Sequence, residues 1–97
     1  VLNYPNPFTE TTRFTFIQNK SNTELDVEIR IFDISGRWIT TLNEQVRTSG
    51  IRVDPIEWDG RNSNGNKVDA GVYMYQIIVT DQLGNTAAQR QKFIKIN

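Results

Sequence analysis

The segment Leu25-Asp26-Val27-Glu28-Ile29-Arg30-Ile31 carries the clearest structural signal in the chain. Its apolar residues alternate with charged ones, so an extended backbone would place the two kinds of side chain on opposite faces. Such a strand packs its apolar face on a core and exposes its charged face to water, as strands of antiparallel sheets commonly do. The segment therefore predicts a half-buried strand of an antiparallel sheet.

Five further segments have strand patterns and are separated by turn residues. They are Arg13–Gln18, Trp38–Val46, Val53–Trp58, Gly71–Thr80 and Thr86–Ile96. The segment 71–80 is apolar on nearly both faces, which is typical of a strand in the middle of a sheet. In the segment 38–46, Ile39 and Leu42 are the expected core contacts, and their spacing of three residues requires a bulge or bend. Pro55 removes a backbone donor and places the segment 53–58 at an edge or an irregularity.

These patterns predict an all-β fold. Turns every eight to twelve residues and the lack of helical periodicity favour an immunoglobulin-like antiparallel β-sandwich of about seven strands. The chain has no Cys, so this sandwich has no disulfide. All 97 residues are predicted to form a single domain, with residues 1–12 as an extended lead-in because Pro5 and Pro7 deny two ladder donors. The expected core is Phe14, Phe16, Val27, Ile29, Ile31, Trp58, Tyr73, Tyr75, Ile77 and Ile94.

Composition limits the function. Eleven Lys plus Arg balance eleven Asp plus Glu, so the chain lacks the positive field that attracts nucleic acid, and no nucleic-acid partner is predicted. The sequence has no His and no Cys, which removes the usual acid-base group, the thiolate nucleophile and the common zinc ligands. We expect no enzyme activity, no catalytic residue and no cofactor.

One polar loop offers oxygen ligands that calcium could use. Asp59, Asn62, Asn64 and Asn66 lie within eight residues, and calcium prefers such hard oxygens at a turn. The spacing does not match a calcium-binding loop, and no bidentate acid follows it. Turn formation is therefore the expected role of this loop, and no metal site is predicted.

Two patterns in the sequence resemble parts of enzyme active sites, but each has a simpler structural explanation. Asp54, Glu57 and Asp59 lie near Trp58, which would suit a glycosidase carboxylate pair beside an aromatic sugar platform. Alternation, however, places residues 57 and 59 on the strand face opposite Trp58, so solvated surface acids are expected instead. Three serines, Ser35, Ser49 and Ser63, fall in turns with no base to activate them.

The last strand segment is locally basic on a chain that has no net charge. Arg90, Lys92 and Lys95 occur there, and no acid follows Asp81. One interpretation is protection, since charged residues on an edge strand discourage aggregation. The other is display, in which an exposed strand ending in Phe93, Ile94 and Ile96 offers backbone groups to a partner by strand addition.

Several motifs, taken in order, resemble one protein family over nearly all of the chain. They are Asn3-Tyr4-Pro5-Asn6-Pro7-Phe8, Ile31-Phe32-Asp33-Ile34-Ser35-Gly36-Arg37, Trp58-Asp59-Gly60, Gly71-Val72-Tyr73 and Lys92-Phe93-Ile94-Lys95-Ile96. The set resembles the C-terminal sorting domains of proteins exported by the type IX secretion system of Bacteroidetes. The stretch 58–73 also resembles the immunoglobulin-like domain of the flagellar hook-capping protein.

The resemblance implies a non-catalytic secretion signal at the end of a larger protein. Such a domain would pass through the periplasm and reach the outer membrane surface or the extracellular space. Translocon or shuttle components would read it there, and a cell-surface sortase would process many of the cargoes. The family's motif positions are Pro5, Pro7, Gly71 and Tyr73, and recognition is expected at Lys92, Phe93, Ile94, Lys95 and Ile96.

Two other classes of function stay open. A carbohydrate-binding sandwich would use an exposed aromatic residue, for which Trp38 is the candidate. A structural module like the hook-capping domain would self-associate through edge strands. A strand-swapped or edge-strand homodimer is a related expectation, because the proline-rich lead-in could let the first strand pair with a neighbouring copy.

Overall fold

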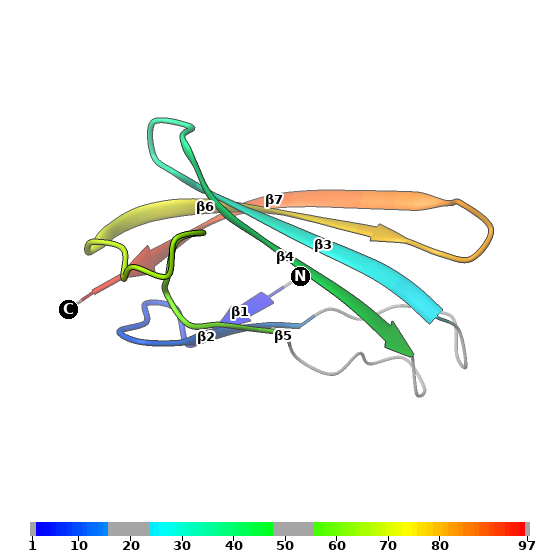
Figure 1. Ribbon diagram of the computed structural model, residues 1–97, viewed down its shortest axis with the longest axis horizontal. Coiled ribbons are helices and arrows are strands. Elements are labelled where there is room, and N and C mark those ends of the chain that lie inside the picture. Colours follow the sequence, from blue (N-terminus) through cyan, green and yellow to red (C-terminus); the bar gives the residue numbers. More distant parts are fainter. Residues whose placement is uncertain (1, 16–23, 48–55, 97) are drawn as a thin grey trace.

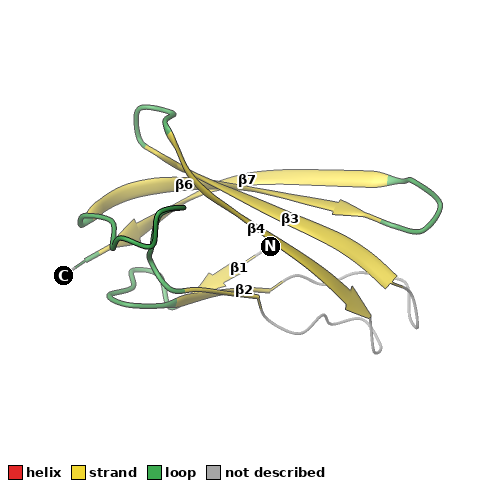
Figure 2. Cartoon of the chain, in the orientation of Figure 1, coloured by secondary structure: helices red, strands yellow, loops and turns green. Residues whose placement is uncertain are grey.

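The computed structural model describes residues 2–15, 24–47 and 56–96, and it confirms the all-β sandwich. Figure 2 shows strands joined by loops throughout these residues. The strands are β1 (Leu2–Tyr4), β2 (Thr12–Thr15), β3 (Glu24–Asp33), β4 (Trp38–Arg47), β5 (Ile56–Trp58), β6 (Gly71–Thr80) and β7 (Thr86–Lys95). The described part of the chain contains no helix that could cross a membrane.

The strands form two antiparallel sheets that face each other. A small sheet has the order β1-β2-β5, and a larger one has the order β4-β3-β6-β7. Figure 1 shows the small sheet beneath the larger one, which is built from ten-residue strands. β7 is therefore an edge strand, and the apolar β6 lies inside the sheet as predicted.

Alternation along β3 builds the centre of the larger sheet. Leu25, Val27, Ile29 and Ile31 are buried, while the residues between them face outward. The predicted bulge in β4 is present, because Ile31 pairs with Thr40 whereas Phe32 pairs with Trp38. The extra residue in β4 lets both Ile39 and Leu42 pack against the core.

Three loops share one turn geometry, which the repeated pattern Asp/Asn-x-x-Gly-x produces. In each loop, the side-chain oxygen of the first residue accepts hydrogen bonds from backbone N–H groups two and four residues later. The glycine adopts φ between 84° and 88°, a region that side chains with a Cβ disfavour. The loops are Asp33–Arg37, Asn62–Asn66 and Asp81–Asn85. The first and third of these loops join β3 to β4 and β6 to β7.

The core differs from the predicted one at the last strand. Phe14, Val27, Ile29, Ile31, Trp58, Tyr73, Tyr75 and Ile77 are buried as predicted, and Phe16 lies outside the described residues. The assignment of Ile94 to the core is wrong, since its side chain is 41% exposed. Phe93 is fully buried in its place, and Phe8, Leu25 and Ile56 complete the core.

The N-terminal segment is more ordered than the predicted lead-in. Residues 2–4 form β1, which pairs with β2 through Leu2 opposite Thr15 and Tyr4 opposite Arg13. The strand ends at Tyr4, because Pro5 has no N–H to continue a ladder. Of the predicted strand 53–58, residues 53–55 lie outside the described residues, and β5 begins at Ile56.

Candidate recognition surface

Phe93 occupies the centre of the aromatic core. Its ring stacks on Phe8 with a centroid distance of 5.6 Å and an interplanar angle of 11°. Its edge contacts are with Phe14, Trp58 and Tyr75, at centroid distances of 5.9, 5.7 and 5.3 Å. Burying a ring of this size stabilises the fold strongly, so the end of β7 is an integral part of the core.

The N-terminal motif and the end of β7 are joined by backbone hydrogen bonds. The Phe8 N–H donates to the carbonyl of Ile94 at 3.0 Å, and the Ile96 N–H donates to the carbonyl of Phe8 at 2.7 Å. The Ile94 N–H donates to Asn6 Oδ1 at 3.0 Å. We call residues 6–8 and 93–96 the terminal clasp. This clasp uses the outward backbone groups at the end of β7, which the display interpretation of the last strand offers to a partner.

Lys95 is inside the clasp and only 7% exposed, which corrects its prediction as a displayed charge. Alternation puts it on the same face as Phe93, so its aliphatic chain is buried with that ring. Its Cε lies 3.4 Å from the position that a Cβ on Gly60 would occupy. Gly60 has φ of +74° and leaves room for the lysine chain and for the carbonyl of Glu10.

The predicted recognition set is therefore divided between two faces of β7. Phe93 and Lys95 face the core, while Lys92, Ile94 and Ile96 are exposed. Ile94 and Ile96 are 41% and 47% exposed, which is unusual for large apolar residues so close together. A partner could therefore contact Lys92, Ile94 and Ile96 directly without unfolding the domain.

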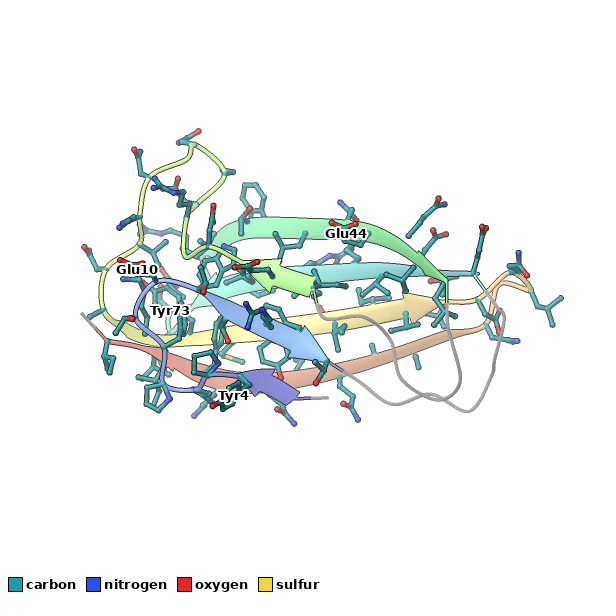
Figure 3. The ribbon with its side chains drawn as sticks, turned by 90° about the horizontal axis from the view of Figure 1, so that it is seen from below. Tyr4, Glu10, Glu44 and Tyr73 are labelled. Atoms are coloured by element: carbon teal, nitrogen blue, oxygen red, sulfur yellow. The ribbon has the colours of Figure 1, made fainter. Side chains whose placement is uncertain are left out.

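The family motif residues have structural roles around the clasp. The carbonyl of Pro5 accepts a hydrogen bond from Thr12 Oγ1 at 2.9 Å, and Pro7 lies between the two clasp residues that bond to β7. Gly71 begins β6 opposite Lys95. The Tyr73 hydroxyl donates to the carbonyl of Asp69 at 2.6 Å. Figure 3 shows Tyr73 and Glu10 at the end of the sandwich where β7 ends, with Tyr4 at the end of β1.

Burial affects the acidity of two core tyrosines. It raises the pKa of Tyr75 to about 12, and the Tyr75 hydroxyl donates to Gln91 Oε1 at 2.9 Å. The pKa of Tyr73 is raised, first by burial and then by the nearby charges of Asp69 and Asp33. Both hydroxyls therefore stay protonated at neutral pH and act as hydrogen-bond donors.

Two residues of the polar loop 59–66 use their side-chain oxygens for turn formation. Asn62 Oδ1 accepts from the N–H groups of Asn64 and Asn66, and Asp59 Oδ1 accepts from the Arg61 N–H. These bonds leave Asn62 Oδ1 directed at the backbone, as the turn interpretation predicts. Among the described residues, no group of three or more His, Cys, Asp or Glu side chains could hold a metal ion.

Within the described residues, the glycosidase-like pattern does not form a site. Trp58 is buried and its Nε1 donates to the carbonyl of Arg61 at 2.9 Å, while Glu57 on the same strand is exposed. The alternation argument therefore holds for these two residues, and Trp58 cannot act as a sugar platform. Asp54 and Ser49 lie outside the described residues, and Ser35 and Ser63 lie in turns.

Trp38 is an exposed aromatic residue on the outer face of the larger sheet, at 51% exposure. It pairs with Phe32, which in turn pairs with Met74. The three apolar residues therefore lie side by side on the adjacent strands β4, β3 and β6. Trp38 Nε1 donates to Thr41 Oγ1 at 2.8 Å. This arrangement keeps the candidate for carbohydrate stacking accessible.

The comparisons with known proteins agree with this architecture. The model of the FlgD Ig-like domain family matches residues 3–84. The chain belongs to this family. The FlgD-type match ends before β7, so it does not include the second half of the terminal clasp. None of the curated proteins matches the chain.

Solved structures resemble this FlgD-type Ig domain to different degrees. Dimeric latent PorU from Porphyromonas gingivalis is 28% identical with a TM-score of 0.84, and the match covers 99% of this chain but 9% of that one. FlgD from P. aeruginosa has a TM-score of 0.64 at 21% identity, covering 88% of this chain and 62% of that one. FlgD from Xanthomonas campestris has a TM-score of 0.60 at 20% identity, covering 89% and 58%. The two FlgD likenesses concern the fold alone.

Proposed function

We propose that this domain is a non-catalytic C-terminal secretion signal that directs an attached protein through the type IX secretion system to the cell surface. The support comes from the motif set, which resembles sorting domains of that system and among them the sorting domain of the sortase PorU. The translocon or shuttle components of the type IX secretion system, together with the cell-surface sortase, would be the partners of this domain. The domain would pass through the periplasm and reach the outer membrane surface or the extracellular space.

The extent of the PorU match is the observation that carries this proposal. The likeness to latent PorU spans 99% of the chain and thus includes β7. The FlgD family match stops at residue 84, whereas the proposed recognition residues all follow it. The resemblance to a type IX protein thus extends over the strand that the signal needs.

The clasp favours recognition of the folded domain. Because Phe93 and Lys95 are buried, a partner that reads the native fold would meet Lys92, Ile94 and Ile96. The clasp bonds also hold the backbone at Ile94 and Ile96 in one conformation, so a partner that binds there would lose little conformational entropy.

A secretion assay tests the proposal. A reporter enzyme fused before residue 1 would be produced in a bacterium with an active type IX system and in a strain lacking its translocon. We expect the reporter on the cell surface or in the medium only in the first strain. Equal distribution of the reporter in the two strains would reject the secretion function.

Matched substitutions then locate the recognition surface. Lys92→Glu with Ile94→Ser alters exposed side chains near the end of β7 and should retain the reporter in the periplasm. Lys67→Glu with Leu83→Ser makes a similar change from cation to acid and from apolar to polar residue at exposed positions in loops, away from the end of β7. Equal secretion of the two double variants would show that the end of β7 is not the surface recognised.

A structural module of a larger extracellular protein is the second candidate, supported by the FlgD Ig-like family match. Such a module would self-associate, and light scattering over a range of concentrations would detect this. Carbohydrate binding through Trp38 is a variant of this function, supported by its exposure. Glycan-array binding that disappears in Trp38→Ala would support it.

A further inference from the structure

The long edge of β7 is only partly covered. β7 pairs with β6 on one side, in regular register from Thr86 opposite Thr80 to Lys95 opposite Gly71. In an antiparallel strand, successive residues direct their N–H and C=O groups to opposite sides. The clasp bonds show that Ile94 and Ile96 direct theirs away from β6. Ala88, Arg90 and Lys92 have the same parity, so their backbone groups also point outward.

No described segment covers this outward side before residue 94. The clasp bonds reach only Ile94 and Ile96, and residues 86–92 are all exposed. The unbroken register means that β7 has no bulge to twist its edge away from a partner. A straight row of unpaired donors and acceptors of this length is a template for an added strand.

The side chains along this edge are cationic. Arg90 and Lys92 alternate with Gln89 and Gln91, so both charges lie on the outer face of the sheet. Neither cation forms one of the ion pairs found in the described part of the chain. An added strand with carboxylates at every second residue would place them beside Arg90 and Lys92, where opposite charges stabilise a cross-strand pair.

Charge argues against a second copy of this chain at the same edge. Pairing β7 with β7 of another copy would bring two Arg90 and two Lys92 side chains into one ladder. The strand from Thr86 to Lys95 has no acidic residue to offset them, and like charges placed across a ladder are destabilising. The edge therefore suits an acidic partner better than itself.

We propose that the edge of β7 from Ala88 to Lys92 binds an extended, acidic peptide segment of another protein by strand addition. The bound segment would continue the larger sheet beyond β7, ending at the clasp. This inference goes beyond the proposed function, which concerns the exposed side chains of Lys92, Ile94 and Ile96 rather than the backbone edge of β7, and it holds whether or not the domain is a secretion signal.

A peptide titration tests the proposal on the full 97-residue chain. The probe is a capped nonapeptide that alternates Glu and Thr, so an extended conformation presents its carboxylates on one face. Two control peptides separate the contribution of charge from that of backbone hydrogen bonding. In the first, Lys replaces Glu, which reverses the charge. In the second, alternate backbone amides are methylated, which removes the donors that would pair with β7. We expect saturable binding of the probe by calorimetry at low salt, and at least tenfold weaker binding of both controls.

Amide hydrogen exchange locates the probe without any substitution. Strand addition would slow exchange at Ala88, Arg90 and Lys92, whose N–H groups point outward. The amides of Ala87, Gln89 and Gln91 already face β6 and should change little. Uniform protection along β7, or protection confined to another part of the chain, would overturn the proposal.

Two variants separate hydrogen bonding from charge. Ala88→Pro removes one outward N–H and keeps both cations, and proline is tolerated where an edge N–H faces solvent. The double variant Arg90→Glu with Lys92→Glu reverses the charge along the edge. The double variant Arg13→Glu with Lys67→Glu makes the same charge change at exposed positions outside β7 and serves as its control. We expect Ala88→Pro and the β7 charge reversal each to weaken binding at least tenfold. Unchanged affinity in either, or a β7-mediated dimer that excludes the probe, would refute strand addition by an acidic segment.

Discussion

Phe93 shows how one residue decides the role of a whole strand. The sequence alone does not decide which alternate residues of β7 face the core. Residues 93, 94 and 96 are all apolar, so either orientation of the strand buries at least one large apolar side chain. Placing Phe93 inward lets its ring stack on Phe8, and this fills the space between the two sheets. The consequence is that Lys95 must also turn inward, which explains how a lysine comes to be 7% exposed.

Substitutions at two adjacent residues should therefore differ strongly. Phe93→Ala removes a fully buried ring and should lower the free energy of unfolding by about 3–5 kcal/mol. Ile94→Ala truncates a partly exposed side chain and should cost about 0.5 kcal/mol or less. Urea denaturation monitored by tryptophan fluorescence measures both. Equal costs would mean that the assigned parity of β7 is wrong.

Tyr75 gives the domain a dependence on alkaline pH. Its pKa is about 12 in the folded state, because burial disfavours the phenolate, against about 10 in an unfolded chain. The raised pKa of Tyr75 therefore adds to the free energy of unfolding. This stabilisation is fully present below about pH 10 and is lost as the pH rises through about 12.

Urea unfolding of the wild type from pH 8 to pH 12 should show this loss of stability above pH 10. Tyr75→Phe should have a flatter profile, because it has no phenol to ionise. Tyr4→Phe, at a position that is 70% exposed, should behave like the wild type. Identical slopes in the wild type and Tyr75→Phe would exclude this tyrosine as the source of the pH dependence.

Most of the buried residues could be predicted from period-two alternation, but two features of the clasp could not. The parity of β7 depends on Phe8, which is distant in sequence and becomes its neighbour only after folding. The pairing of Asn6 with Ile94 likewise joins residues at opposite ends of the chain. A signal for the clasp was present in Phe8, a large apolar residue within a proline-rich segment.

At the level of elements, the three Asp/Asn-x-x-Gly-x loops determine how the strands connect. Glycine favours turns, so the sequence predicts a turn at each of these positions, whereas the role of the Asp or Asn three residues earlier is evident only from the hydrogen bonds of the structure. In the structure that residue is the acceptor for the loop's own amides. The pairing of the short β1 was not predicted either, because Pro5 and Pro7 favoured an extended lead-in without ladder hydrogen bonds.

Asp33 should stabilise its loop in a pH-dependent manner. Hydrogen bonds from the Ser35 hydroxyl and the Arg37 N–H lower the pKa of Asp33 below its ordinary value of 3.8. The ionised carboxylate therefore stabilises the fold above the unfolded pKa, and this contribution is lost as the pH falls through the lower folded pKa.

A pair of substitutions tests this role of Asp33. Asp33→Ala should lower the urea midpoint at pH 7, because it removes the acceptor. Asp33→Asn should have a smaller effect, since Asn62 performs the same function in its own loop. NMR titration of the wild type should give a carboxyl pKa below 3.8. A pKa at or above that value would contradict the assigned hydrogen bonds.

For the whole molecule, the clasp makes the final residues a requirement for folding. Deleting residues 92–97 removes Phe93 and every clasp partner of Phe8, so the remaining chain should be unfolded at 25 °C. Circular dichroism and the dispersion of amide resonances would show this. A native spectrum from the truncated chain would contradict the role that we assign to Phe93.

This expectation affects how secretion experiments are interpreted. Loss of secretion on truncation would follow from unfolding alone, so it would give no information about a recognition signal.

The sandwich architecture, the central position of β6 and the bulge in β4 followed from the sequence. Which face of the last strand is exposed required the packing of both chain ends together.

The clasp also has a mechanical consequence. Residue 8 and the end of β7 pair as parallel neighbours, so tension applied to the two chain ends pulls the segments past each other along their length. The two backbone hydrogen bonds of Phe8 would then carry the load at the same time rather than opening one after another. A domain stretched from both termini should resist extension until this contact shears, and only then release its sheets.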